Sequence, residues 1–321
     1  MQSVRYKLKK IKGDASFRTF YRKVDNKRNS IIVFAIKEKK KNLLIYDAIN
    51  SLLIKNNVLA PKLYKENYKK NFIEIEDFGD ETVFKLLKKN KNNKINLYKK
   101  SVDLLIKIQK IKQNEIKNFK GKNYKVPIYA NNKLFKEAKL FSDWYARKYI
   151  SKNKLLKFNF EINKQVKFLI SNLKLKNDTL VHRDFHVSNL MQYKKQLAII
   201  DTQDALTGNR AYDLASLIDD VRFKSDKKLK DNIYNYYLKL NKNKINKVIL
   251  LHDFEILSVI RNMKIIGIFA RLATRDKKIK YLKLIPYAWK LIELRIKNNE
   301  IFAKLKRLLD LNFSREIRSL K

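Results

Sequence analysis

The sequence contains no cysteine and only three histidines, at positions 182, 186 and 252. Without thiols the chain can form neither a disulfide framework nor a thiolate metal site. The histidines do not have the spacing of a zinc site. The absence of cysteine fits a reducing compartment.

Long apolar runs are also absent. No segment approaches the roughly 20 uncharged apolar residues that a transmembrane helix requires. The first residues, MQSVRYKLKKIKGD, are basic but include neither the apolar stretch nor the cleavage site of a secretory signal. We therefore expect a cytoplasmic protein without membrane insertion.

Acidic residues are few: 31 Asp and Glu stand against 75 Lys and Arg, a net charge of +44. Such a charge attracts nucleic acid and anionic membranes non-specifically at low salt. The lysines, however, are spread through Asn-rich stretches such as 65–71 and 88–96, and no RNP1 motif, zinc finger or Gly-rich arginine tract occurs. We interpret the charge as compositional drift and expect no specific nucleic-acid partner. The sequence does not indicate an oligomeric state.

Of the 321 residues, 45% are hydrophobic and 12% aromatic. This apolar content is sufficient for one or two packed domains. Strand-like segments at 17–24, 31–36 and 71–76 surround one helical pattern at 43–54. After Gly79 helical periods dominate, at 95–108, 133–149, 162–173, 212–222 and almost continuously from 247. In one of them, residues 214, 217, 218 and 221 predict a single buried face. We expect an α+β, two-lobed protein-kinase-like fold, with a small β-rich N-lobe (1–78) and a large, mainly helical C-lobe (79–321).

The segment 180–201, LVHRDFHVSNLMQYKKQLAIID, has the spacing of a kinase catalytic loop: His182, Arg183 and Asp184, four residues, then Asn189. Phosphoryl transfer requires a carboxylate that orients the attacking hydroxyl and oxygen ligands that hold Mg²⁺ against the phosphates of ATP. We predict that Asp184 is the catalytic base, that Asn189 and Asp201 bind Mg²⁺, and that ATP and Mg²⁺ are the cofactors.

Two short apolar runs, 190–193 and 197–200, flank a Lys-Lys turn and predict a β-hairpin. That hairpin would return Asp201 to the side of Asn189. Taken singly, each polar residue could be a turn former or the end of a strand, but the spacing and the hairpin together favour the catalytic interpretation. We expect His182 and His186 to support the loop rather than to react.

Candidates for nucleotide binding in the N-lobe are Ser16 and Lys37. Ser16 lies in a 13–18 turn whose N–H groups could approach phosphate, although an ordinary hairpin turn is equally compatible. Lys37 ends the run FAIK, which resembles the strand whose lysine pairs with nucleotide phosphates. Asp47 could be its carboxylate partner or lie on a solvated helix face. The segment 72–78 is predicted to be the strand and hinge that offer backbone groups to adenine.

The catalytic segment, with DTQD (201–204) in place of DFG, resembles the aminoglycoside phosphotransferase and choline kinase superfamily. One branch, the bacterial anomeric kinases of N-acetylmuramate and N-acetylglucosamine, is similar over segments that span nearly the whole chain. These are GDASFRTFYRK (13–23), IEIEDFGDET (73–82), LFKEAKLFSDWY (134–145), DTQDALTGNRAYDLASLIDD (201–220) and RNMKIIGIFARLATRDKKIKYLKLIP (261–286).

The resemblance implies an ATP-dependent sugar kinase acting on an anomeric hydroxyl in cell-wall sugar recycling. It assigns the same roles to the catalytic trio and makes Asp213 a buried carboxylate that braces the catalytic loop. Thr202 stands in place of the usual Phe, and Asn209 in place of the usual Pro. Where the branch carries Asp-Ala-Pro, this chain has Ala35-Ile36-Lys37. The resemblance therefore does not support a nucleotide-binding role for Lys37. Kinases of choline, homoserine or an aminoglycoside remain alternatives, as does an inactive RNA-binding or adaptor protein with a kinase fold.

Two C-lobe segments could recognise a sugar. Glu137 and Asp143, with Trp144 and Tyr145 beside the latter, combine carboxylates and aromatic rings as hydroxyl recognition and ring stacking require, although the rings could equally pack into the lobe. A stripe of basic residues on one helix could meet an anionic substrate or simply be a solvated face. The stripe consists of Arg261, Lys264, Arg271 and Arg275, of which we choose Arg271 for the lactyl carboxylate of N-acetylmuramate.

Overall fold

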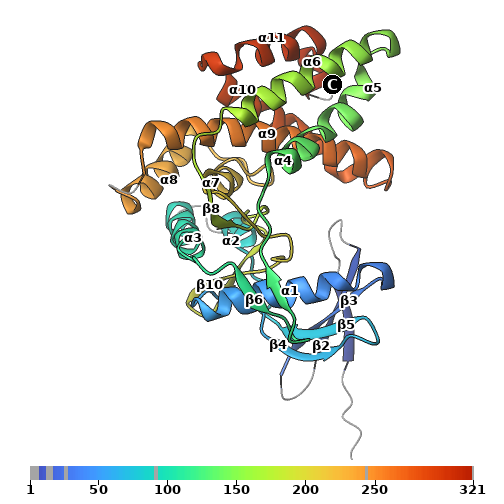
Figure 1. Cartoon of the computed structure of the whole chain (residues 1–321), viewed down its shortest axis with the longest axis vertical. Coiled ribbons are helices and arrows are strands. Elements are labelled where there is room, and N and C mark those ends of the chain that lie inside the picture. The colour runs from blue at the N-terminus through green and yellow to red at the C-terminus, as the bar shows by residue number, and fades with distance from the viewer. Residues whose placement is uncertain (1–6, 12–16, 25–27, 90–92, 243–244, 320–321) are drawn as a thin grey trace, which may run out of the picture. The chain divides into compact units, whose positions relative to one another are not determined.

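The computed structural model describes residues 7–11, 17–24, 28–89, 93–242 and 245–319 (Figure 1). The chain divides into two compact units, each built from two stretches of sequence. The first unit comprises residues 1–127 and 179–207, and the second comprises 128–178 and 208–321. The lobe boundary that we expected at residue 79 stays a prediction, because these units follow packing alone.

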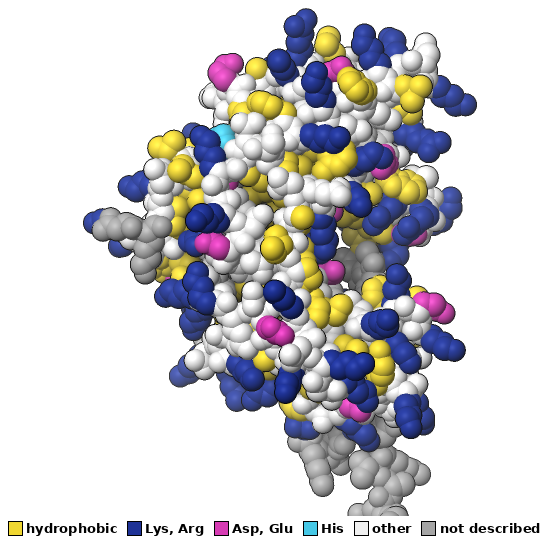
Figure 2. All heavy atoms as spheres, in the orientation of Figure 1, with side chains coloured by type: hydrophobic (Ala, Val, Ile, Leu, Met, Phe, Trp, Pro, Cys, Tyr) yellow, Lys and Arg dark blue, Asp and Glu magenta, His cyan; other side chains and the backbone are white. Residues whose placement is uncertain are grey.

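Lysine and arginine side chains are scattered over the face shown in Figure 2, with hydrophobic and a few acidic side chains between them. On this face the positive charge does not gather into one patch, which fits the dispersed lysines of the sequence. Among the described residues, no helix is both long and apolar enough to cross a membrane.

The first unit begins with a five-stranded antiparallel sheet in the order β1-β2-β3-β5-β4. Alternation sets its faces: in β5, which reads FIEIE, Ile73 and Ile75 are buried, while Glu74 between them and Glu76 after them are partly exposed. The five strands are β1 (Lys7–Ile11), β2 (Arg18–Val24), β3 (Ser30–Ala35), β4 (Leu63–Asn67) and β5 (Phe72–Glu76).

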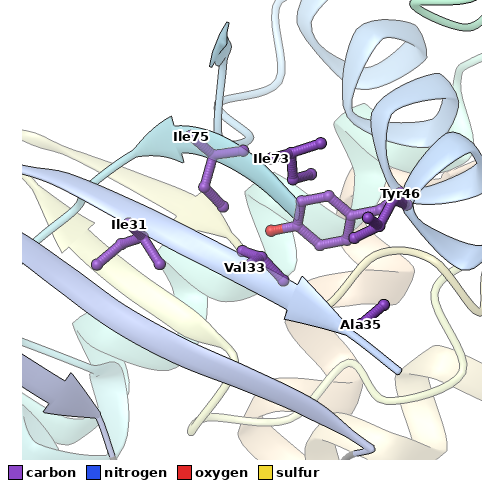
Figure 3. Packing of buried hydrophobic residues seen from close by; sticks show 7 residues of the cluster. Ile31, Val33, Ala35, Tyr46, Ile73 and Ile75 are labelled. Carbon is purple, nitrogen blue, oxygen red and sulfur yellow. The ribbon is translucent and has the colours of Figure 1, made fainter. Parts of the chain in front are cut away.

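Helix α1 (Lys41–Lys55) covers one face of this sheet (Figure 1). Its Leu43 and Tyr46 pack against Val33 of β3 and against Ile73 and Ile75 of β5, and all five side chains are buried (Figure 3). Fully burying one such aliphatic or aromatic side chain contributes about 1.5–3 kcal/mol. This cluster therefore holds α1 and the sheet together as one layer pair.

The remainder of the first unit carries three short two-stranded pairings. The hairpin β9–β10 was predicted from the sequence and is confirmed, with Leu190 opposite Ile199. The other elements are η1 (Lys37–Lys39), α2 (Val83–Lys89), α3 (Lys94–Gln109), β6 (Glu115–Lys117) paired with β7 (Asn123–Lys125), β8 (Asn177–Val181) paired with β11 (Leu206–Asn209), β9 (Leu190–Tyr193) and β10 (Gln196–Ile199).

The second unit is helical and is organised around α9 (Lys247–Thr274), which contacts α4, α7, α10, η3 and η4. The apolar residues of α9 are distributed around its circumference rather than along one stripe, as expected of a helix enclosed by neighbours. The other helices are α4 (Asn131–Ala138), η3 (Phe141–Ala146), α5 (Arg147–Tyr149), α6 (Lys152–Ser171), α7 (Ala211–Ile218), α8 (Lys227–Leu240), η4 (Ile279–Leu284), α10 (Ile285–Ile296), η5 (Glu300–Phe302), α11 (Ala303–Asn312) and α12 (Arg315–Ser319).

Several predicted helices are wrong in extent. The expected helix 133–149 is broken into α4, the π-helical turn η3 and α5, and α6 begins ten residues earlier than the expected 162. The predicted helix 212–222 ends at Ile218, and it is buried on all sides rather than on one face. Helix α8 was not predicted, because a composition rich in Lys, Asn and Tyr obscures its apolar period.

Gly267 explains how closely α9 approaches the start of η3. A β-carbon at this position would lie 2.5 Å from the backbone nitrogen of Phe141 and closer still to the carbonyl group of Leu140. Only a residue without a side chain allows the two backbones to meet at this distance. The wide turn of η3 lies directly after this contact.

Candidate active site

The predicted catalytic loop is held by the ring of His182. Its Nε2 donates to the carbonyl of Ile200 at 3.0 Å, and its Nδ1 accepts the backbone N–H of Asp184 at 3.3 Å. Because Nδ1 accepts, this network assigns the proton to Nε2. His182 is buried, and these two bonds tie the H-R-D segment to Ile200, the residue that follows β10.

Asn189 closes the loop from the other side. Its Nδ2 donates to the carbonyl of Asp184 at 3.0 Å, its backbone N–H donates to the carbonyl of His186 at 2.9 Å, and its own carbonyl accepts from the N–H of Ile200 at 3.1 Å. The hairpin therefore returns the chain to Asn189, and Asp201 follows at once. The sequence predicted this juxtaposition.

Asp201 and Asn189 each keep one oxygen free of donors. Oδ1 of Asp201 accepts from Arg18 Nη2 at 2.7 Å and from Gln203 Nε2 at 3.1 Å, whereas no described residue donates to its Oδ2. The Nδ2 of Asn189 is tied to the backbone, and its Oδ1 likewise has no donor within the described chain. Carboxylate and amide oxygens of this kind are what Mg²⁺ takes, with water and phosphate completing its coordination. The residues present fit the predicted metal.

The described parts of the chain contain no cluster of three or more His, Asp or Glu side chains that could enclose a metal alone. Mg²⁺ usually uses one or two protein ligands plus substrate phosphates.

Arg18, at the start of β2, is a site residue that the sequence analysis missed. It is buried, and its guanidinium donates from Nη2 to Asp201 and from Nη1 to Oε1 of Gln203, both at 2.7 Å. The rings of Phe20 and Tyr46 lie 5.6 and 5.7 Å from its Cζ. Burial raises the pKa of Tyr46 to about 12, so that ring stays neutral beside the cation. Only the resemblance of segment 13–23 hinted at this residue.

Two residues next to the predicted catalytic groups have left-handed backbones. Arg183 has φ 73° and Asp201 has φ 65°, a conformation that costs a side-chain-bearing residue about 1–3 kcal/mol. Side-chain bonds hold the strained segment: Arg183 Nη1 donates to the carbonyl of Asp204 at 3.1 Å, and Gln203 Nε2 donates to Asp204 Oδ2 at 3.1 Å. Asp204 thus supports the loop.

The two departures from the family pattern both have structural partners. Thr202 is fully buried, and its hydroxyl donates to Oδ1 of Asn50 in α1 at 2.6 Å, while Asn50 donates to the carbonyl of Pro61. Asn209 donates to Asp253 at 2.6 Å, and its Oδ1 accepts the N–H of Ala211 at the start of α7. Each of the two polar side chains thus forms a hydrogen bond within its own unit.

The predicted hinge after β5 is clamped by Arg22. This side chain donates to Asp77 at 2.6 Å, to Asp80 at 2.8 Å and to the carbonyl of Gly79 at 3.1 Å. Gly79 has φ 80°, which a glycine adopts without strain. The hydrogen bond from Arg22 lowers the pKa of Asp80. The adenine contacts expected of this segment stay a prediction.

Two N-lobe residues, Ser16 and Lys37, were predicted to bind the nucleotide. Ser16 lies outside the described residues. The strand predicted to reach residue 37 ends at Ala35, and Lys37 is an exposed residue of η1. Both alternatives for Asp47 are wrong: its carboxylate is buried and accepts the backbone N–H of Phe119 at 2.7 Å. Burial raises the pKa of Asp47 to about 6.

In the second unit, Glu137 forms an ion pair with one residue of the basic stripe. Glu137 pairs with Lys264 at 2.8 Å and accepts from the hydroxyl of Tyr129, and Lys264 Nζ lies 3.4 Å from the hydroxyl of Tyr212. The solvated-face interpretation of the stripe is wrong for Arg261 and Lys264, which are buried. Only the end of the stripe is solvated: Arg275 is exposed and pairs with Asp276.

Asp143 lies elsewhere in this unit, on η3. It pairs with Lys139 at 2.9 Å and, together with Trp144 and Arg147, lines a cavity of about 490 Å³ that does not include Glu137. Arg271 is partly buried, and burial, with the nearby Arg275, lowers its pKa. Asp213 is fully buried in α7, as the resemblance implied, and its bracing of the loop stays a prediction.

Comparison with known proteins shows which proteins this chain is similar to. The model of a family described as the phosphotransferase enzyme family matches residues 7–245. The N-acetylmuramate/N-acetylglucosamine kinase of Pseudomonas aeruginosa is 26% identical over 303 residues, which cover 92% of this chain and 86% of the relative. The proteins of the same name from Pseudomonas putida and Neisseria meningitidis are each 26% identical, over 85% of this chain and 79% and 81% of the relatives.

Solved structures agree on the fold. An ADP-bound aminoglycoside phosphotransferase, APH(2'')-Ib, superposes with a TM-score of 0.62 at 14% identity, over 89% of this chain and 92% of that one. An ethanolamine kinase of Plasmodium vivax gives a TM-score of 0.59 at 16% identity, over 90% and 82%. At such identities these likenesses carry the fold alone, and they confirm the expected protein-kinase-like α+β class.

Proposed function

Since the chain belongs to the phosphotransferase enzyme family and is an ATP-dependent kinase, we propose that it phosphorylates the anomeric hydroxyl of an amino sugar, namely N-acetylmuramate, N-acetylglucosamine or both. Three relatives that share most of its length carry that substrate pair in their names. The reaction would take place in the cytoplasm and serve the recycling of cell-wall sugars.

The observation that carries this proposal is the hairpin that sets Asp201 beside Asn189, next to the loop of Asp184. The two donor-free oxygens of Asn189 and Asp201 would hold Mg²⁺. When bound with ATP, the metal neutralises charge that develops on the phosphates. Asp184 orients the sugar hydroxyl and accepts its proton, and His182 keeps the backbone of Asp184 in place.

Arg18 adds a positive charge to this site. By bonding Oδ1 of Asp201 it leaves Oδ2 as the oxygen available to the metal, and it fixes the carboxylate in one orientation. Lys37 is exposed, and Asp47, its predicted partner, bonds the backbone of Phe119 instead, so the buried cation that we place in this site is Arg18. On the sugar side, Glu137 and Asp143 remain the proposed hydroxyl-binding residues.

A substrate panel tests the reaction. ADP release would be followed with N-acetylmuramate, N-acetylglucosamine, choline, homoserine and an aminoglycoside as acceptors, and phosphorus NMR would locate the phosphate on the product. We expect turnover with one or both amino sugars and an anomeric phosphate. Turnover confined to another acceptor would refute the sugar assignment, and the absence of Mg²⁺-dependent ADP release with every acceptor would favour an inactive adaptor.

A further inference from the structure

The helix α9 carries three polar residues on one buried face, one helical turn apart: Ser258, Arg261 and Lys264. The outer two have strong partners. Ser258 donates to Oδ2 of Asp219 at 2.6 Å, and Lys264 pairs with Glu137 at 2.8 Å. The middle residue, Arg261, is 2% exposed, and neither its Nε nor its Nη1 finds a hydrogen-bond partner in the described chain.

A second buried polar group without a hydrogen-bond partner among the described residues lies on the neighbouring helix, at the height of Arg261. Helix α7 runs antiparallel to α9, since Tyr212 is beside Lys264 at one end and Asp219 meets Ser258 at the other. This register puts Ser216, which shares a face with Tyr212 and Asp219, opposite Arg261. Ser216 is fully buried, and its Oγ also has no partner among the described residues.

A buried guanidinium without a counter-charge is costly, because desolvation is not repaid by any bond. The two carboxylates that bond the outer residues of this face have other partners: Asp219 is shared by Lys230 and Arg295, and Glu137 is held by Lys264. Donors at Arg261 and Ser216 would therefore be satisfied by an oxyanion brought by a ligand. Arginine suits a planar carboxylate especially well.

We propose that Arg261 and Ser216 form a carboxylate-binding site between α7 and α9, and that Arg261 rather than Arg271 recognises the acidic group that distinguishes N-acetylmuramate from N-acetylglucosamine. The second half of this statement rests on the proposed function. Arg271 lies ten residues further along α9, about 15 Å along the axis, so it belongs to a different level of the helix. Arg271 also has an Nε without a partner in the described chain, but its side chain is only partly buried, whereas Arg261 is 2% exposed and has two such nitrogens.

The first experiment tests the anion site without using turnover. Thermal unfolding of the full chain would be compared in sodium D-lactate and in sodium chloride of equal ionic strength, for the native protein, Arg261→Met and the control Arg295→Met. We expect lactate to raise the melting temperature of the native protein and of the control, but not of Arg261→Met. In chloride, Arg295→Met should melt lower because Asp219 loses a partner, whereas Arg261→Met should not. A lower melting temperature of Arg261→Met in chloride, or no effect of lactate on the native protein, would mean a structural or water-filled position and would overturn the proposal.

The second experiment measures kcat/KM for both sugars in Arg261→Met and in the matched variant Arg271→Met. The ratio of N-acetylmuramate to N-acetylglucosamine should fall roughly ten- to a hundredfold in Arg261→Met, the loss expected for one charge-assisted bond, and recover in part in Arg261→Lys. An unchanged ratio, or the same fall in Arg271→Met, contradicts the assignment. If the native protein used neither sugar, the proposed function would fail, while the lactate experiment would still decide the anion site.

Discussion

The pair formed by Arg18 and Asp201 allows a quantitative test of the site. The two side chains meet at 2.7 Å, with Arg18 4% exposed and Asp201 41% exposed. A hydrogen bond between charged groups contributes about 1.5–3 kcal/mol. Because water reaches Asp201 and screens the pair, the coupling should be smaller than in a fully buried pair, and we expect about 1–2 kcal/mol.

A double-mutant cycle measures that coupling. The free energy of unfolding in urea would be determined for the native protein, Arg18→Met, Asp201→Asn and the double variant. We expect the double variant to be more stable than the sum of the single losses predicts, by about 1–2 kcal/mol. Methionine retains contact with the rings of Phe20 and Tyr46, so lost packing contributes little.

The control is Arg22→Met, on the same strand. Arg22 bonds Asp77 and Asp80 instead, so its loss should be additive with Asp201→Asn. Fluorescence titration with an ATP analogue in Mg²⁺ completes the test, and Arg18→Met should weaken binding about tenfold if Arg18 orients the metal ligand. Coupling below about 0.3 kcal/mol, together with unaltered Mg²⁺-dependent binding, would refute the positioning role.

Four further predictions concern other residues. Asp184→Asn should leave nucleotide binding largely intact but lower turnover at least ~100-fold, the loss expected for a positioned base, and near-native single-turnover rates would exclude that role. Asp201→Ala should abolish Mg²⁺-dependent nucleotide binding while Asp204→Ala is milder, because Asp204 bonds only the loop, and equal losses in a metal titration would contradict this. Burial raises the pKa of Asp47 from 3.8 to about 6, so the free energy of unfolding falls by up to about 3 kcal/mol as the pH rises through that interval. Asp47→Asn cannot ionise and should not show this fall. The measurement is the free energy of unfolding between pH 4 and 8, which should vary less with pH in the variant. Gly267→Ala should lower stability by about 1–3 kcal/mol because its methyl group meets the backbone at Leu140 and Phe141, and an unchanged melting temperature would show that the two backbones can separate.

Local chemistry explains why the catalytic segment could be predicted so closely. Two short apolar runs on either side of a basic turn can pair in few ways other than as a hairpin. The register of that hairpin and the return of Asp201 to Asn189 therefore follow from neighbouring residues alone. The same holds for helix 43–54 and the strands around it, which were located to within about two residues. The mainly helical remainder was also evident from periodicity.

The partners of individual side chains were not predictable in this way, because they come from residues far apart in the chain. Arg18 reaches Asp201 across 183 positions, and nothing local to either residue indicates the pairing. Lys37 matched a motif, but the strand ends before it. Asp47 was expected to pair with Lys37 or to lie on a solvated helix face, although it bonds the backbone of Phe119 in a distant loop.

Burial was decided by packing in the same manner. Periodicity described one apolar face on α7 and a basic stripe on α9, yet neighbouring helices enclose both elements and place Arg261 and Lys264 inside. The sequence by itself thus determined the hairpin that returns the chain to Asn189, and the catalytic roles of the residues that it joins stay a prediction. Tertiary structure alone decided which charges are neutralised and which, like Arg261, are buried without a counter-charge from the described residues, because desolvation depends on all the elements that surround a group.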